Sequence, residues 1–189
     1  MEFFRNLRIS AGKSMLKARM ARIKRKPHYI NFCNIKNVGI VWDASKTDDF
    51  AILTRFHQKM AELGKEVRIF GFFPEKGFPD QYTAIRYLTC LKRKEINFFY
   101  LPVNSEAELF IQTKFDVLID INFKKHLPLF YVTSLSKAGL KVGLADSKPE
   151  SSHLDLMISM KSPLNIEIYL EQILYYLEMI NSESTKKAV

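Results

Sequence analysis

Six polar residues stand at or just beyond the ends of predicted strands, where a sheet would gather them on one edge: Asp43, Ser45, Asp120, Asn122, His126 and Asp146. In open α/β sheets, ligands bind outside the carboxyl ends of the strands, near the point where the strand order reverses. Carboxylate, amide, hydroxyl and imidazole groups placed there can bind a sugar hydroxyl, a ribose or a metal ion. The sequence therefore predicts a candidate ligand pocket made by these residues.

The same residue types also have a purely structural explanation. Asp, Asn and Ser side chains cap helices and close turns by bonding to nearby backbone groups. Strand ends in an α/β fold lead into short loops and helix starts, where such bonds are needed. From the sequence alone, both interpretations of the six residues stay open.

A second candidate site is the strongly basic N-terminal segment. Nine of the first 26 residues are Lys or Arg, and Glu2 is the only acidic residue among them, whereas the whole chain has a net charge of +9. The basic residues are Arg5, Arg8, Lys13, Lys17, Arg19, Arg22, Lys24, Arg25 and Lys26. Such asymmetry indicates a polyanion or an anionic surface as the partner, because each neutralised phosphate releases a counterion.

The basic segment is predicted to be a helix over 3–26. It contains no Pro and a single Gly, Gly12, and Pro27 ends it. On a helical wheel, one apolar stripe contains Phe3, Phe4, Leu7, Ala11, Met15, Ala18 and Ala21. A second, narrower stripe on the far side contains Ile9, Leu16, Met20 and Ile23. Basic residues lie between the two stripes on both flanks.

Several partners fit this helix. Nucleic acid fits two basic flanks, and the partner that we predict is RNA or a ribonucleoprotein such as the ribosome. A helix docked on its own body, or on a second copy of the chain, would use its charges only for solubility. A membrane surface fits two separated stripes less well, because an interfacial helix has one broad apolar face. The Arg-rich, acid-poor composition also resembles a targeting peptide, although we expect the segment to be retained.

Known catalytic and metal-binding motifs are absent from the sequence. There is no Gly-x-Gly-x-x-Gly, no phosphate-binding Gly-x-x-x-x-Gly-Lys-Ser/Thr and no Gly-x-Ser-x-Gly. Cys33 and Cys90 are isolated, and the four His residues are far apart in the chain. We therefore expect no catalytic residue, no cofactor and no bound metal, and Cys90 is predicted to be a small buried hydrophobic residue on a helix.

The rest of the chain alternates predicted strands and helices. Strands are predicted over 36–43, 66–73, 96–101, 115–122, 140–144 and 155–160. Helices are predicted from the capping segment 45–49 to 63, over 80–94, from 105, over 126–138 and over 165–180. This alternation is typical of βαβ units, which form a mostly parallel sheet covered on both faces. The predicted fold is a single doubly wound, Rossmann-like α/β domain over 28–181, with a basic helical arm over 1–27 and a frayed polar tail over 182–189.

Length and composition support one globular domain. A chain of 189 residues with 47% hydrophobic and 26% charged residues resembles ordinary globular proteins, which argues against disorder. Two Cys residues cannot form a disulfide framework. The sequence has no apolar stretch long enough for a transmembrane helix, so none is expected.

Two families share features with this sequence. Residues 115–120 (FDVLID), followed by a predicted helix and by Leu140-Lys-Val-Gly143-Leu, resemble a stretch of heptosyltransferase-type glycosyltransferases. That resemblance covers about thirty residues, and the chain is too short for the two Rossmann-like halves of that family. Nearly the whole chain resembles a small bacterial family of unknown function, through its basic N-terminal helix, its Val-Gly-Ile strand ending in Asp43 and the 115–120 segment. This second resemblance implies a bacterial cytoplasmic setting.

The sequence therefore favours a non-enzymatic binding protein whose basic helix contacts a polyanion. The alternatives are a sugar- or nucleotide-binding α/β enzyme that uses the predicted pocket, and a protein attached to a membrane surface. Self-association through the narrow apolar stripe also stays open. What separates these hypotheses is whether the first helix docks on the body or projects from it.

Overall fold

One sheet of six parallel strands forms the centre of the protein in the computed structural model, which describes residues 2–145 and 153–180. The strands are β1 (Asn37–Asp43), β2 (Glu66–Phe73), β3 (Leu88–Lys92), β4 (Val117–Asp120), β5 (Leu140–Leu144) and β6 (Leu156–Ile158). Their spatial order is β3-β2-β1-β4-β5-β6. The order reverses between β1 and β4, as in dinucleotide-binding folds. The predicted α/β fold class is confirmed.

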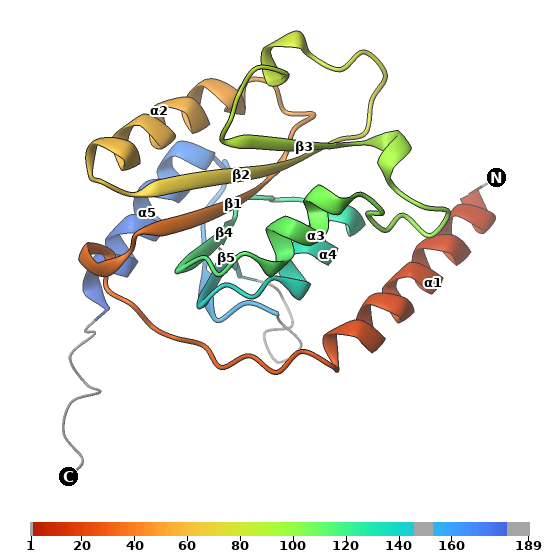
Figure 1. Cartoon of the computed structure of the whole chain (residues 1–189), viewed down its shortest axis with the longest axis horizontal. Coiled ribbons are helices and arrows are strands. Elements are labelled where there is room, and N and C mark those ends of the chain that lie inside the picture. The colour runs from red at the N-terminus through yellow and green to blue at the C-terminus, as the bar shows by residue number, and fades with distance from the viewer. Residues whose placement is uncertain (1, 146–152, 181–189) are drawn as a thin grey trace.

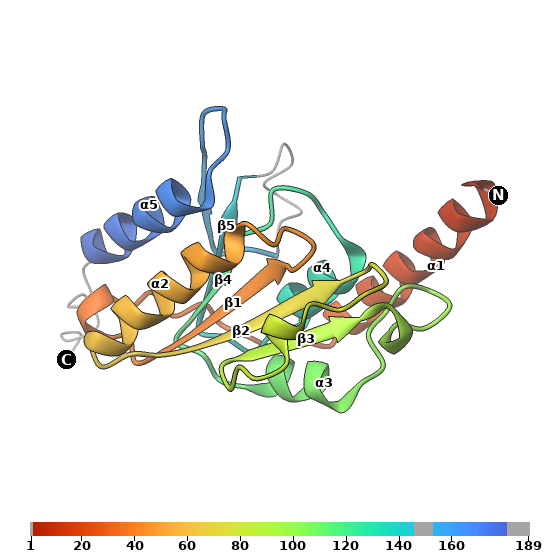
Figure 2. The same ribbon diagram turned by 90° about the horizontal axis from the view of Figure 1, so that it is seen from above.

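Helices cover both faces of the sheet, as Figures 1 and 2 show. One face carries α2 (Asp49–Glu62) and α5 (Ile166–Met179), and the other carries α1 (Glu2–Met20), α3 (Ser105–Gln112) and α4 (Leu127–Leu135). Along β1, Ile40 and Trp42 belong to the core on the α2 and α5 side, whereas Val41 belongs to the core on the other side. Successive strand residues point to opposite faces, so an unbroken apolar run is needed to cover both.

The region between β2 and α3 differs from the prediction of a helix over 80–94. Instead, β3 lies between two short 3₁₀ turns, Asp80–Tyr82 and Arg93–Glu95. Leu88 packs on the α2 and α5 side of the sheet and Leu91 packs on the opposite side. An odd separation of three residues places two side chains on opposite faces of a strand. The apolar spacing that resembles one face of a helix therefore places side chains on both faces of an edge strand.

The predicted strand over 96–101 is also wrong, because this segment forms a tight loop. The Asn97 side-chain oxygen accepts hydrogen bonds from the backbone N–H groups of Phe99 and Leu101, at 2.9 and 3.0 Å. Ile96 and Pro102 form a single antiparallel bridge across the base of the loop. Asn side chains that bond to nearby backbone stabilise turns. Here this turn chemistry outweighs the strand preference of the aromatic run.

The first helix ends at Met20, not near residue 26 as predicted. The following segment crosses to the start of β5, where the Arg25 guanidinium donates to the Gly139 carbonyl at 2.9 Å. The His28 backbone N–H donates to the same carbonyl, also at 2.9 Å. These bonds fix the path of 23–28 outside a helix, so tertiary contacts override the helix propensity of this segment.

The narrow apolar stripe of α1 docks the helix on the body. Leu16 is 1% exposed and belongs to the core cluster that includes Leu129 and Val132 of α4. Gly12 lies against the backbone of Phe99, where a Cβ atom would collide with the carbonyl oxygen. The N-terminal turns of α1 extend past the body (Figures 1 and 2). The helix is therefore docked along one side, while its other sides stay on the surface.

Two predicted features lie outside the residues that the structure describes. They are the pocket residue Asp146 and the polar tail over 182–189. No helix within 2–145 and 153–180 is long and apolar enough to cross a bilayer.

Candidate functional site

Asp43 and His126 form a pair at the carboxyl edge of the sheet. Asp43 ends β1 and His126 precedes the first residue of α4, and their Oδ2 and Nε2 atoms are 3.1 Å apart. The Ser45 hydroxyl donates to the other carboxylate oxygen of Asp43 at 2.7 Å. Burial of Asp43 favours its neutral form, but the hydrogen bonds from His126 and Ser45 outweigh burial and lower its pKa. The structure thus brings three of the predicted pocket residues into one hydrogen-bonded group.

Asp120 and Asn122 form a separate group at the end of β4. Asp120 accepts hydrogen bonds from the side chains of Asn122 (2.7 Å) and Thr133 (2.9 Å), and Asn122 also donates to the Val41 carbonyl at 3.0 Å. Desolvation raises the pKa of Asp120, because these bonds only partly offset the loss of water. The group links β4, β1 and α4. Asp120 and Asn122 therefore have the structural role that the sequence left open beside ligand binding.

The two groups border two cavities, and His126 lines both of them. Asp120, Asn122 and His126 line a small cavity of about 190 Å³. His126 also lines a larger cavity of about 830 Å³, which Arg5 and Lys13 of α1 close from the other side. Neither cavity is lined by Asp43 or Ser45. His126 is therefore the predicted pocket residue that connects the sheet edge with the basic helix.

Three of the nine N-terminal basic residues have partners inside the protein. Arg8 donates to the Phe98 carbonyl at 2.7 Å, and its guanidinium lies 3.9 Å from the centre of the Phe98 ring. Arg19 lies 4.0 Å from the Glu108 carboxylate. Arg25 binds both carboxylate oxygens of Asp155, at 2.6 and 2.7 Å. Sequence reasoning assigned these three residues to polyanion contact, and the structure gives them internal contacts.

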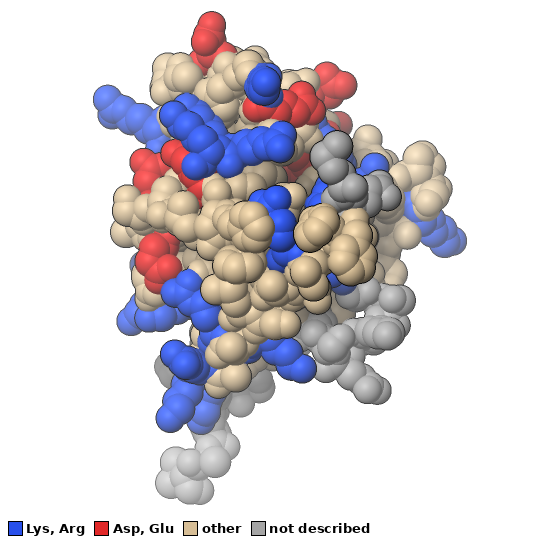
Figure 3. Space-filling model, turned by 90° about the vertical axis from the view of Figure 1, so that its right-hand side faces the viewer, with Lys and Arg blue, Asp and Glu red and all other residues tan. Residues whose placement is uncertain are grey.

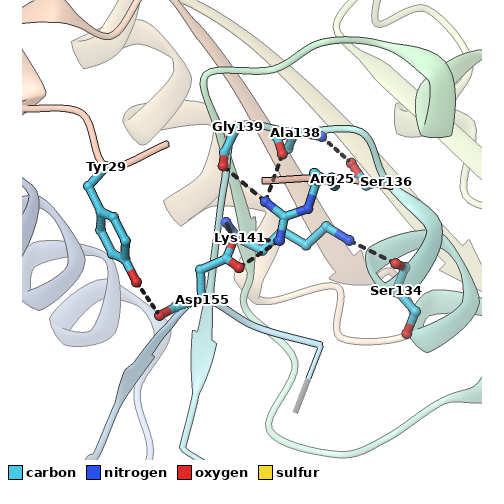
Figure 4. A network of polar contacts seen from close by, with 8 residues as sticks. All are labelled: Arg25, Tyr29, Ser134, Ser136, Ala138, Gly139, Lys141 and Asp155. Carbon is cyan, nitrogen blue, oxygen red and sulfur yellow. Dashed lines mark hydrogen bonds and ion pairs between the residues drawn. The ribbon is translucent and has the colours of Figure 1, made fainter. Parts of the chain in front are cut away.

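Arg25 is the centre of the polar network drawn in Figure 4. Besides Asp155, its guanidinium binds the carbonyls of Ala138 and Gly139, at 3.1 and 2.9 Å. The neighbouring Lys141 side chain is 2% exposed and donates to the Ser134 carbonyl at 2.7 Å. Burial, followed by repulsion from Arg25, lowers the pKa of Lys141 to about 7. This network fastens the segment after α1 to β5, β6 and α4.

Other basic residues of the segment line a hollow at the amino edge of the sheet, with a volume of about 650 Å³. We call this feature the cationic hollow and define it by Arg22, Lys24, Lys26, His28, Lys114 and Lys137. All six side chains are exposed, and within the described residues none of the five Lys and Arg side chains has an ion-pair partner. Asp116 lines the hollow too, but its carboxylate accepts two backbone N–H bonds of 2.8 Å.

Sequence reasoning missed the contribution of the body to this charge. Lys114 lies between α3 and β4, and Lys137 lies between α4 and β5. Both loops start strands that sit next to each other in the sheet, so the fold brings them to the end of the basic segment. Figure 3 shows a neighbouring face, which includes the N-terminal end of α1 and on which Lys and Arg outnumber Asp and Glu. A net charge near zero for residues after 26 hid these local clusters.

Thiol and metal chemistry finds little support in the described residues. Cys90 lies on β3, not on a helix as predicted, and burial raises the pKa of its thiol to about 12. Within 2–145 and 153–180, no group of three or more His, Cys, Asp or Glu side chains is arranged to hold a metal ion.

Comparison with known proteins gives a family but no activity. Neither the curated proteins nor the solved structures include a match, so the local resemblance to glycosyltransferases gains no support. A family of unknown function, DUF6913, matches residues 8–180. That range includes most of α1, the whole described sheet and α5. The chain with its docked basic helix, its cationic hollow and its parallel sheet therefore belongs to the DUF6913 family.

Proposed function

We propose that the protein binds a polyanionic chain, and that this chain is single-stranded RNA held at the cationic hollow. The proposal is carried by one observation: basic side chains from three separate segments converge there. Arg22, Lys24 and Lys26 come from the N-terminal segment, and two loops of the body add Lys114 and Lys137. Convergence of unpaired charges from distant parts of a chain is costly without a ligand, because like charges repel.

Exposed rings beside these charges support RNA as the polyanion. His28 lines the hollow, and the next residue, Tyr29, does not line it but has 52% of its surface exposed. Single-stranded nucleic acids bind where basic grooves contact the backbone and exposed rings stack on the bases. We propose that the protein meets such strands in RNA or in a ribonucleoprotein such as the ribosome.

The test is the salt dependence of RNA binding, measured by fluorescence polarisation with a labelled oligouridylate. In a triple variant, Lys24→Gln, Lys114→Gln and Lys137→Gln remove one charge from each segment of the hollow. Each lost phosphate contact on a single strand reduces the magnitude of the negative slope of log K against log salt by about 0.7, so this magnitude should fall by about 2. The affinity of the triple variant for RNA at low salt should also fall.

A charge-matched variant controls for net charge. Lys59→Gln, Lys76→Gln and Lys161→Gln remove three exposed charges that do not line the hollow. This control should bind RNA like the unmodified protein. The proposal fails if the protein does not bind RNA at low salt, or if both triple variants lose affinity equally.

A second candidate function is attachment to an anionic membrane surface through α1. The broad apolar stripe of this helix stays uncovered, with exposed fractions of 75% for Phe3, 70% for Phe4, 58% for Leu7 and 45% for Met15. Docking of the narrow stripe removes the objection that two stripes do not suit a membrane. Lys13 and Lys17 flank the exposed stripe on one side, and Arg8 flanks it on the other. A single apolar face with basic flanks is typical of interfacial helices.

Vesicle co-sedimentation tests this second candidate. Binding should require anionic phosphatidylglycerol in the vesicles and should be lost in a Phe4→Ser, Leu7→Ser variant. The hollow variant Lys24→Gln, Lys114→Gln, Lys137→Gln should keep most of its vesicle binding, because these residues lie beyond the exposed stripe. Concentration-dependent dimerisation that the Ser substitutions abolish, without vesicle binding, would instead assign the stripe to a second copy of the chain.

A further inference from the structure

We infer that the larger cavity at the carboxyl edge of the sheet is a binding site for a nucleotide with two or more phosphates. This carboxyl-edge pocket has a volume of about 830 Å³ and is distinct from the cationic hollow, which lies at the amino edge. Its floor is made by the ends of three strands and the loops that follow them. Phe72 is the last residue but one of β2 and Pro74 follows that strand, Arg93 follows β3, and His126 lies between β4 and α4.

The docked helix α1 completes this pocket. Arg5, Ile9 and Lys13 of α1 form the wall opposite the strand ends. Docking requires Gly12, which lies against the Phe99 backbone of the loop after the Arg93–Glu95 turn. A site walled by α1 explains why an exposed, basic helix is held in one position on the body. Neither the helix nor the sheet edge forms the pocket alone.

The charges of the carboxyl-edge pocket indicate a phosphorylated ligand. Four Lys or Arg residues and one His line it: Arg5, Lys13, Arg93, Lys125 and His126. No Asp or Glu is among the described lining residues. The Asp43 carboxylate, which pairs with His126, does not line the cavity. Guanidinium and ammonium groups bind phosphate oxygens by charge-assisted hydrogen bonds, and several of them suit more than one phosphate.

One side of the pocket is apolar and rigid, which suits the base of a nucleotide. Ile96, Tyr100 and Phe130 contribute to it. Tyr100 adopts a left-handed backbone conformation (φ 62°), and Arg8 packs 4.9 Å from the centre of its ring. Residues with positive φ other than Gly are uncommon, and such strain clusters at ligand sites. The loop bonds of Asn97 hold Tyr100 in this conformation.

The position in the fold agrees with this ligand. The pocket lies at strand carboxyl ends, next to the reversal of strand order between β1 and β4, where open α/β sheets bind their ligands. Its volume falls within the range of small-molecule sites, about 300–1,000 Å³. Leu127 and Pro128, which begin α4, also line it. The positive end of that helix dipole adds to the attraction of phosphate.

Isothermal titration calorimetry of the full chain with ADP tests the inference. Arg93→Ala and Lys13→Ala each remove one phosphate contact from an exposed position, so the fold should be kept. Each substitution should raise the Kd of ADP about tenfold, the loss expected for one charge-assisted hydrogen bond. Lys17→Ala, on the same helix, and Lys94→Ala, next to Arg93, are matched controls that do not line the pocket. Both controls should leave the Kd unchanged.

Ligand fragments and variants decide between the outcomes. ADP should bind more tightly than either pyrophosphate or adenosine, because phosphates and base contact different walls. No ADP binding at millimolar concentration would overturn the site, and so would equal losses in pocket and control variants. Equal affinity for pyrophosphate and ADP would overturn the assignment of the base to the apolar wall. Failure of the RNA proposal can be distinguished from failure of this nucleotide site. The variant Lys24→Gln, Lys114→Gln, Lys137→Gln should retain ADP binding.

Discussion

At the scale of single residues, the environment of a side chain decides its chemistry more than its position along a strand does. Asp43 and Asp120 both end strands of the sheet and both looked like pocket residues. Hydrogen bonds from His126 and Ser45 lower the pKa of Asp43 despite its burial, whereas desolvation raises the pKa of Asp120. Asp120 lines the small cavity beside Asn122, whereas Asp43 lines neither of the two cavities described at this edge.

Lys141 gives a prediction at this scale, because its pKa falls from 10.5 to about 7 in the folded protein. Between these values the unfolded chain holds the Lys141 proton and the folded protein does not, so stability rises with pH in this window. Lys141→Met removes this gain. Urea unfolding at pH 7, 8 and 9 should show a slope against pH that is smaller by roughly 1 kcal/mol per unit in the variant.

The control for this experiment is Lys36→Met, which changes an exposed Lys. Its stability should follow the pH dependence of the unmodified protein. If Lys141→Met and the unmodified protein show the same slope between pH 7 and 9, the Lys141 ammonium stays charged in the folded state and the assignment is wrong.

At the scale of elements, the docking of α1 depends on a residue that is poor for a helix. Gly in a helix interior costs about 1 kcal/mol relative to Ala. Gly12 is nevertheless required, because a Cβ atom at this position would collide with the Phe99 carbonyl oxygen and press on Leu127. The close approach of α1 to the 97–101 loop therefore outweighs the low helix propensity of Gly at this position.

Gly12→Ala should thus destabilise the protein although it improves the isolated helix. We expect a loss of about 1–3 kcal/mol in urea unfolding, the range for overpacking a close contact. Ser10→Ala, at an exposed position of the same helix, should be neutral or slightly stabilising. Increased stability of Gly12→Ala would show that α1 does not dock where the structure places it.

At the scale of the whole molecule, the basic residues divide into separate groups at opposite edges of the sheet. The cationic hollow lies where strands β4 and β5 begin, and the carboxyl-edge pocket lies where β2, β3 and β4 end. The helix α1 connects the two edges, and its 19 residues span about 28 Å at 1.5 Å per residue. A count of charges along the chain does not distinguish these two groups of basic residues, because only the fold places them at opposite edges of the sheet.

This separation predicts that the two proposed sites act independently. Sites that are far apart and share no partner usually contribute additively to within about 0.5 kcal/mol, or roughly twofold in affinity. Saturating ADP should therefore change the Kd of oligouridylate by less than about twofold in fluorescence polarisation. Arg93→Ala should leave RNA binding equally unaffected. Competition between ADP and RNA would show that both ligands use one surface.

Much of the architecture was predictable because burial on both faces of a parallel strand requires long apolar runs. The runs at β1 and β4 are apolar up to their terminal Asp residues, those at β2 and β5 are mostly apolar, and the alternation with helices indicates a doubly wound sheet. Apart from the end of the first helix, which lies at Met20, the errors fall between 80 and 101, where short apolar spacings fit a helix and a strand equally well. Hydrogen bonds that the Asn97 side chain accepts and the edge position of β3 decide this region, and neither is visible in local periodicity.

The sequence by itself determined the excess of basic residues before Pro27, the pair of apolar stripes on the first helix and the parallel α/β class. Local composition and periodicity carry this information, because they depend on residues close in the chain. Only the tertiary structure decided which stripe docks, that Arg25 binds Asp155, and that Lys114 and Lys137 join the basic segment. These contacts join residues that are far apart in the chain. The pattern of charge and hydrophobicity along the chain does not specify which distant residues will meet.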